Sequence, residues 1–88
     1  MDWYTCSKTF INVVDCKSFS QASRTMYTTH SSISKRIAWL ENQLDTQLLI
    51  RSTRRLELTE AGEKYYNKIV HLIDEWEETK KRLAEQQK

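Results

Sequence analysis

The segment from Thr29 to Leu44 most constrains the fold, because its apolar residues repeat with the spacing of a helix. They recur at steps of four, three and four, which places them on one helical face: Ile33, Ile37, Leu40 and Leu44. Thr29 can cap this helix, since its hydroxyl can accept from the free backbone N–H groups of the first turn. The sequence therefore predicts an amphipathic helix that begins here and packs its apolar face on a core.

The opposite face of this helix is polar and low in profile. It carries short donors and acceptors with one cation: His30, Ser31, Ser34, Lys35 and Ala38. The major groove of DNA admits one helix, and a strip of this kind suits the groove floor. The alternative is an amphipathic core helix with a solvated outer face, and this segment alone does not separate the two.

Two shorter helices are predicted before it. Apolar residues at helical spacing predict a first helix over residues 3–15. Ser18 followed by Gln21 has the form of a capping box, which opens a short helix that should end near Tyr27. Tyr27 and Thr28 then form the turn before Thr29. Two helices joined by so short a turn, the second with a polar outer strip, match the helix-turn-helix pattern.

Beyond Leu44 the pattern changes to that of a short hairpin. Residues 47–52 and 56–59 are predicted strands, and in the second Leu56 and Leu58 alternate with Glu57. Three arginines and no acid occupy the five residues 51–55, namely Arg51, Arg54 and Arg55. A hairpin with arginines at its tip directly after a helix-turn-helix is a wing, and its charge favours an anionic partner. An ordinary surface hairpin with solvated arginines is the alternative.

The last helix is predicted from Thr59 to Lys88, with no breaker after its first turn. Thr59 can cap it, and acids in the first turn suit the helix dipole. An apolar seam advances by alternating steps of four and three through Gly62, Tyr66, Ile69, Ile73, Trp76, Lys80 and Leu83. So small a domain cannot bury this whole seam, and a second copy is the simplest partner. Alternatively, the first half packs on the domain and the rest projects into solvent.

Charge is distributed unevenly along the 88 residues, a length that suits one small domain. The net charge is only +2, but residues 17–58 hold seven Lys or Arg against three acids. From residue 59 onward six bases meet seven acids. A basic middle and a balanced tail predict one surface that faces an anion and another that faces protein or water.

The cysteines and histidines indicate neither a disulfide nor an enzyme. Cys6 and Cys16 lie roughly 15 Å apart along one predicted helix, which excludes a bond between them. Free thiols, with no signal peptide and no membrane-length apolar run, predict a cytoplasmic protein. His30 and His71 fall on different helices without a nucleophile or paired acids, so we expect no enzyme, no cofactor and no metal site.

Assembled in order, these residues resemble the N-terminal DNA-binding domain of LysR-type transcriptional regulators, a bacterial family. The matching segments are Phe10 with Val13 and Val14, Ser18-Phe19-Ser20 with Ala22, Ile33 to Ile37 with Leu40-Glu41, and the stretch from Arg51 to Glu63 (RSTRRLELTEAGE). The resemblance covers nearly the whole chain. It implies a mainly α fold: a winged helix-turn-helix over residues 1–58, with three helices and a two-stranded wing, and a linker helix for dimerisation over residues 59–88.

The resemblance also implies how the chain would bind DNA. The helix over residues 30–43 would enter the major groove, and Arg54 would enter the minor groove. The residues expected to contact DNA are Thr29, His30, Ser31, Ser32, Ser34, Lys35, Arg36, Arg51, Arg54 and Arg55. For Arg36 a solvated surface position is an equal alternative, and Arg51 or Arg55 could instead pair with Glu57.

Six positions depart from the family pattern, among them Leu49 and Ile50, which stand where the family commonly has a phenylalanine and an acid. Lys17, Tyr27 and Asp45 stand where the family usually has glycine, or glycine or asparagine in the case of Tyr27. His30 stands where it usually has glutamine, at a position expected to face bases.

The partners implied are an interrupted palindrome of double-stranded DNA and a second copy of the chain. The expected dimer contacts are Tyr66, Ile69, Ile73, Trp76 and Leu83. A small-molecule effector would bind a larger C-terminal domain that this chain lacks, so the chain resembles a fragment, and dimer or tetramer is left open for the full-length protein. The competing class is a protein-interaction module: a winged helix that dimerises through residues 59–88 and binds an acidic partner with its basic face.

Overall fold

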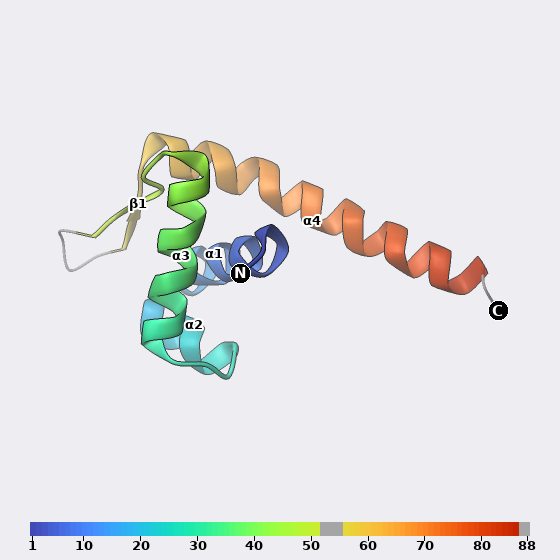
Figure 1. Cartoon of the computed structure of the whole chain (residues 1–88), viewed down its shortest axis with the longest axis horizontal. Helices are drawn as coiled ribbons and strands as arrows, with labels where there is room; N and C mark the ends of the chain where they lie inside the picture. The colour runs from blue at the N-terminus through green and yellow to red at the C-terminus, as the bar shows by residue number, and fades with distance from the viewer. Residues whose placement is uncertain (52–55, 87–88) are drawn as a thin grey trace.

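The computed structural model describes residues 1–51 and 56–86 of the chain. Four helices and two short strands follow in the order α1 (Trp3–Cys16), α2 (Phe19–Thr25), α3 (His30–Leu44), β1 (Leu49–Ile50), β2 (Glu57–Leu58) and α4 (Glu60–Gln86). Helices α1, α2 and α3 form a compact body, the strands project from one side of it, and α4 crosses its top and extends away (Figure 1). The predicted winged helix-turn-helix with a long final helix is confirmed.

Side-chain caps set the starts of the helices. The carboxylate of Asp2 accepts from the Thr5 amide, and the Thr29 hydroxyl accepts from the Ser32 amide. The Ser18 hydroxyl accepts from the Gln21 amide, so the predicted cap of α2 is present. Only half of the capping box forms, however, because the Gln21 side chain accepts from Arg24 instead of reaching back to Ser18. Helix α2 also ends earlier than predicted, at Thr25.

The core lies between α1, α3 and the first half of α4. Phe10 of α1 is fully buried against α3, and its ring lies 5.7 Å from the ring of Tyr65 of α4. Three of the four residues of the apolar face predicted for α3 are buried, namely Ile33, Ile37 and Leu40, whereas Leu44 at its C-terminal end is 40% exposed. Three faces separated in sequence thus share one hydrophobic interior, which is the dominant stabilising contribution in a domain of this size.

The strands of the wing are shorter than predicted. Leu49 pairs with Leu58 and Ile50 pairs with Glu57, in antiparallel register. The predicted strands covered residues 47–52 and 56–59. Among their described residues these two pairs form the ladder, and residue 52 lies outside the part of the chain that the structure describes. One further backbone bond continues from its base, where the Thr59 amide donates to the Leu48 carbonyl at 3.0 Å.

Within residues 1–51 and 56–86, three residues other than glycine adopt the left-handed backbone conformation. They end α1, the α2 region and α3 respectively, at Lys17 (φ 57°), Tyr27 (φ 53°) and Asp45 (φ 51°). A Cβ atom disfavours this conformation, which is why glycine commonly occupies such positions. These are the same three positions at which the sequence departs from the glycine or asparagine of the family pattern.

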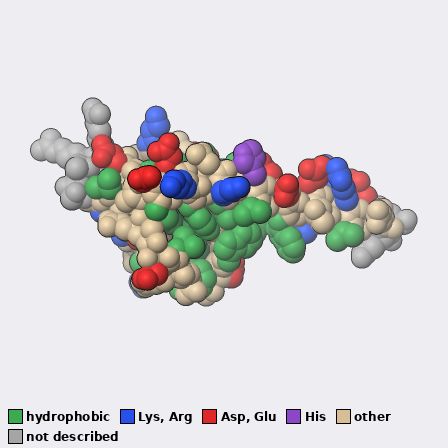
Figure 2. All heavy atoms as spheres, turned by 90° about the horizontal axis from the view of Figure 1, so that it is seen from above, with side chains coloured by type: hydrophobic (Ala, Val, Ile, Leu, Met, Phe, Trp, Pro, Cys, Tyr) green, Lys and Arg blue, Asp and Glu red, His purple; other side chains and the backbone are tan. Residues whose placement is uncertain are grey.

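The second half of α4 carries apolar side chains that the described part of the chain leaves uncovered. Leu72, Trp76 and Leu83 keep 50%, 51% and 56% of their surface exposed, and Trp3 of α1 keeps 44%. Hydrophobic side chains gather beside the middle of α4 and recur toward its C-terminal end (Figure 2). Among the described helices, none is both long enough and apolar enough to cross a membrane.

Candidate nucleic-acid interface

The outer face of α3 presents the polar strip that the sequence predicted. His30, Ser31 and Lys35 are exposed, and Ser34 is partly exposed between them. Because the apolar side chains of α3 point into the core, this strip has to face away from it. A helix with one buried face and a short, polar outer face can approach the edges of base pairs closely.

The N-terminal turn of α3 is fixed by its own hydroxyls. The Thr29 hydroxyl accepts from the Ser32 amide at 3.0 Å and donates to the Ser32 hydroxyl, also at 3.0 Å. Thr29 therefore acts first as a cap. The Ser32 hydroxyl still has its own proton to donate, so a phosphate could bind there without breaking the cap.

His30 is held by an aromatic contact from α2. Its ring lies 5.2 Å from the ring of Phe19, with the two planes tilted by 34°. Offset aromatic pairs at this distance are favourable. The contact restrains the side chain at the start of the predicted DNA-contacting helix.

Glu41 connects the C-terminal half of α3 to the wing. One carboxylate oxygen accepts from the backbone amides of Leu48 and Leu49, at 2.7 and 3.3 Å. The other accepts from the Arg51 guanidinium at 3.3 Å. The hairpin is thereby attached to α3 at its base.

Arg51 does not pair with Glu57, as one interpretation of the sequence had it. It pairs with Glu41, and its guanidinium carbon also lies 5.6 Å from the centre of the Phe19 ring. A guanidinium has five N–H groups, and these contacts do not use all of them. A phosphate could therefore still accept a hydrogen bond from Arg51. Arg54 and Arg55 lie outside the described residues.

Arg36 is turned toward α1. Its guanidinium donates to the hydroxyl of the buried Thr9 at 3.3 Å, and the side chain is partly buried. Arg36 is therefore not a freely solvated charge, and its contact with DNA stays a prediction. Arg36 joins α3 to α1, a role that the sequence analysis did not consider.

Polar contacts fix α4 against α1. The Tyr66 hydroxyl donates to the Asp15 carboxylate at 2.5 Å, and this hydrogen bond raises the pKa of Tyr66. Ser7 and Tyr65 share a hydrogen bond of 2.7 Å between their hydroxyls. Further along α4, the Glu77 carboxylate accepts from Tyr4 at 2.7 Å. These contacts span three turns of α4 and therefore fix its direction relative to the rest of the domain.

The residues predicted to form a dimer contact divide into two groups. Ile69 and Ile73 are 1% and 4% exposed, because they belong to the core of their own chain. They have little surface left for a partner, which corrects their assignment. Tyr66 is partly buried, whereas Trp76 and Leu83 are exposed and continue the same helical seam.

Two contributions at this surface were not foreseen from the sequence, namely Glu41 as the anchor of the wing and Phe19 as the partner of His30 and Arg51. Their partners lie seven or more residues away along the chain, and no local spacing marks such contacts. Both residues belong to segments that match the family pattern, Ser18-Phe19-Ser20 and Leu40-Glu41, but the pattern does not show these contacts.

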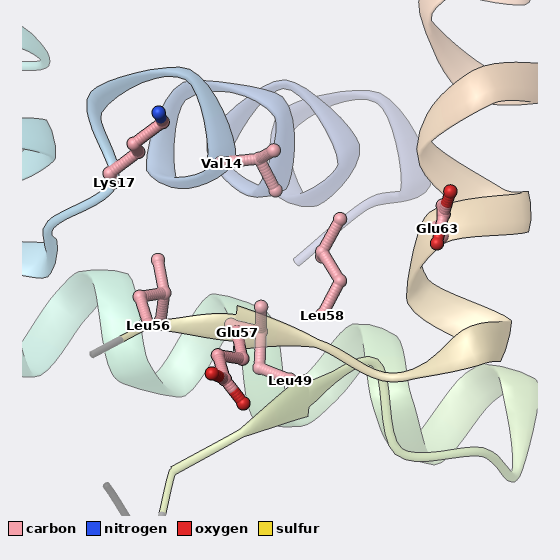
Figure 3. Close-up of a pocket in the computed structure, with 7 residues that line it drawn as sticks. All are labelled: Val14, Lys17, Leu49, Leu56, Glu57, Leu58 and Glu63. Carbon is pink, nitrogen blue, oxygen red and sulfur yellow. The ribbon is translucent and has the colours of Figure 1, made fainter. Parts of the chain in front are cut away.

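An open groove lies behind the wing, with a volume of about 320 Å³. It is lined by residues at the end of α1, in and next to the two strands and at the start of α4. Leu56 and Leu58 point toward α1, whereas Glu57 between them points to the opposite side of the strand (Figure 3). No serine, histidine or cysteine is among its described lining residues. Within residues 1–51 and 56–86, no three His, Cys, Asp or Glu side chains gather as metal ligands.

Comparison with known proteins identifies the architecture. The family model described as "Bacterial regulatory helix-turn-helix protein, lysR family" matches residues 7–63. The HTH-type transcriptional regulator HdfR of Salmonella newport is 38% identical over 77 residues, which cover 88% of this chain and 28% of HdfR. The chain thus spans little more than a quarter of that relative's length.

Solved structures agree with this match. The DNA-binding domain of BenM, solved in complex with catB site 1 DNA, superposes with a TM-score of 0.79 at 28% identity, over 94% of this chain and 96% of that one. Full-length AphB of Vibrio cholerae gives a TM-score of 0.81 at 29% identity, over 93% of this chain and 28% of AphB. The chain belongs to the LysR family of bacterial regulatory helix-turn-helix proteins, and its fold is the family's winged helix-turn-helix DNA-binding domain with its linker helix.

Proposed function

We propose that this chain binds double-stranded DNA in a sequence-specific manner, as the DNA-binding part of a transcriptional regulator. The observation that carries the proposal is the exposed strip of α3, at His30, Ser31 and Lys35, on a helix whose other face is buried. Each of these side chains can meet base edges: serine donates or accepts, neutral histidine does either, and lysine suits guanine O6 and N7. Residues 30–43 would lie in the major groove.

The wing supplies the second part of the proposed interface. Its base is fixed to α3 through Glu41, so its tip would reach the DNA at a set distance from the major-groove helix. Arg54 would enter the minor groove, where narrow A·T-rich segments attract arginine, and Arg51 and Arg55 would contact phosphates. The BenM domain, which has the same fold, was solved on DNA, and this supports DNA as the ligand of the class.

A homodimer on an interrupted palindrome is the proposed assembly. Trp76 and Leu83 are exposed and extend the helical seam of α4 beyond the buried Ile69 and Ile73. Isolated apolar side chains are common on protein surfaces, but a seam of this length with a tryptophan in it favours a partner. A second copy is the simplest one, because it would cover the same face by symmetry.

The dimer has a direct test. Trp76→Glu should give a monomer in sedimentation experiments, because it places a charge on the seam. His71→Glu is the matched control, because His71 is exposed on another side of α4. A dimer that persists in Trp76→Glu would refute the assignment of this seam to the dimer interface.

Regulation by a small molecule is proposed for the full-length protein only. The chain covers 28% of HdfR, and effector binding would belong to the part that this chain does not span. The free thiols of Cys6 and Cys16 suit a reducing compartment, and we propose the cytoplasm as its location.

The experiment that tests DNA binding is selection of bound duplexes from a random-sequence pool, followed by mobility shifts against competitor DNA. We expect a recurring half-site and an affinity that falls with rising salt. Retention of no duplex over competitor at low salt would refute the proposal. It would favour the protein-interaction alternative, in which the basic face binds an acidic protein.

A further inference from the structure

We infer that Phe19 is a positioning residue that holds the two DNA-facing elements, the start of α3 and the base of the wing, in one arrangement. This inference rests on the proposed DNA binding. It assigns a role to a side chain that is not itself among the expected DNA contacts.

The first observation is that Phe19 contacts both elements. Its ring lies 5.2 Å from the ring of His30, the first residue of α3. The same ring lies 5.6 Å from the guanidinium carbon of Arg51, which directly follows β1. His30 and Arg51 are 21 positions apart in sequence, and Phe19 belongs to neither of their elements.

The second observation concerns how each partner would behave without the ring. His30 and Arg51 are both exposed, and exposed side chains of this kind sample several rotamers. An aromatic contact removes part of that freedom before any ligand arrives, so less conformational entropy is lost on binding. Arg51 is restrained twice, by the Phe19 ring and by the Glu41 carboxylate at 3.3 Å.

The third observation is that Phe19 is itself well held. It is partly buried, packs against the hydrophobic core, and follows the Ser18 cap at the start of α2. A side chain fixed in this way can hold two exposed neighbours at a set position relative to the core. Lys35, the cation of the polar strip, makes no contact with Phe19 among the described aromatic and cation–π pairs, and therefore provides an internal control.

A double-mutant cycle tests the inference. The probe is a duplex selected by the wild-type chain from a random pool, and a scrambled duplex of the same length measures non-specific binding. Phe19→Leu should weaken binding to the selected duplex about 5- to 20-fold and leave the scrambled duplex almost unchanged, within the usual range of contact coupling. The double variants that combine Phe19→Leu with His30→Ala or with Arg51→Ala should lose affinity for the selected duplex by a smaller factor than the product of the two single losses. The difference should be at least about threefold. Combined with Lys35→Ala, the effects should multiply to within about twofold.

A purely structural role for Phe19 gives a different result. Phe19→Leu would then weaken binding only by lowering the fraction of folded protein. Its fold-loss of affinity would multiply in the same way with the loss from His30→Ala, Arg51→Ala or Lys35→Ala. That outcome overturns the inference while leaving the proposed function intact. If the wild-type chain selects no duplex, the proposed function fails, and the inference fails with it.

Two further variants keep the test decisive. Phe19→Tyr retains the aromatic ring and should bind the selected duplex as tightly as the wild type, because the inference requires only the ring. Phe19→Met replaces Phe19→Leu if circular dichroism shows that the leucine variant is unfolded. In the free protein, the NMR resonances of the His30 ring protons should move in Phe19→Leu and not in Phe19→Tyr. Unmoved resonances in Phe19→Leu would show that the ring contact is absent in solution and would also overturn the inference.

Discussion

The carboxylate of Glu41 lies 2.7 Å from the backbone nitrogen of Leu48, and this contact attaches the wing to α3. The same carboxylate also accepts from the Leu49 amide and the Arg51 guanidinium. A single acidic residue in a basic segment thus fixes two surfaces that both face the proposed ligand. Acids in a DNA-binding face repel phosphate, but this one is directed inward, against backbone amides.

Glu41→Gln should therefore destabilise the fold by about 1–3 kcal/mol, because hydrogen bonds to a charged, partly buried acceptor are worth more than neutral ones. Urea unfolding followed by circular dichroism measures the change. Glu78→Gln is the control: Glu78 pairs with Arg82 on the exposed surface of α4, and its loss should cost less than about 0.5 kcal/mol. Equal effects in the two variants would contradict the anchoring role.

Lys17→Gly should stabilise the chain by about 0.5–1 kcal/mol. Lys17 has a φ of 57°, and the left-handed conformation costs a residue with a Cβ atom roughly 1–2 kcal/mol. The greater flexibility of glycine in the unfolded chain takes back only roughly 0.5–1 kcal/mol. The same substitution at Lys68, which is exposed within α4, should be destabilising by about 1 kcal/mol. Thermal melting of both variants should thus give shifts of opposite sign.

Gly62→Ala should be destabilising by about 1–3 kcal/mol, even though alanine normally favours a helix over glycine. A Cβ at Gly62 would lie 2.0 Å from the carbonyl oxygen of Leu48. That oxygen accepts the backbone bond from Thr59, so backbone atoms would have to move at the junction of wing and α4. Urea unfolding that finds an unchanged or raised stability would refute this close approach.

The contact between α1 and α4 should weaken in acid. The hydrogen bond from Tyr4, followed by the one from Lys8, holds the pKa of the Glu77 carboxyl below its ordinary value. A carboxyl whose pKa is lowered by folding stabilises the fold above its unfolded pKa, about 4.3, and loses that contribution as the pH falls through the folded pKa. Stability near pH 7 should therefore include this contact, and stability at a pH below the lowered pKa of Glu77 should lack it.

Glu77→Gln tests this pH dependence. The variant should lose stability less steeply than the wild type between neutral pH and acid, as measured by urea midpoints at several pH values. Tyr4→Phe removes the main donor and should give the same change of slope. If both variants follow the wild-type curve, the contact contributes nothing to the acid transition.

Lys35→Ala distinguishes base recognition from phosphate binding on α3. If Lys35 contacts a base, affinity for the selected duplex should fall by about 1–3 kcal/mol, and preference should relax at one base pair. If it contacts only phosphate, the loss should be similar on all sequences and the salt slope should shrink by about 0.9. Fluorescence anisotropy at several salt concentrations separates the two. Unchanged binding in both respects would remove Lys35 from the interface.

The local sequence was sufficient to place most helix boundaries and the outer strip of α3. The repeat of Ile33, Ile37 and Leu40 predicted the buried face, and Thr29 predicted the first turn, because both signals act within a few residues. The wing was predicted from alternation at Leu56, Glu57 and Leu58, although the strands proved shorter. Its arginine tip remains a prediction, since residues 52–55 are outside the described structure.

Only the tertiary structure decided which side chains hold these elements together. Arg51 pairs with Glu41 and not with Glu57, because the orientation of the wing base depends on contacts between distant segments. Along α4 the seam has uniform spacing in the sequence, yet Ile73 is buried and Trp76 is exposed. Tyr4 and Lys8 of α1 still contact Glu77, one residue beyond Trp76. The difference therefore depends on which side of α4 the rest of the domain covers, and this is not encoded in either helix alone.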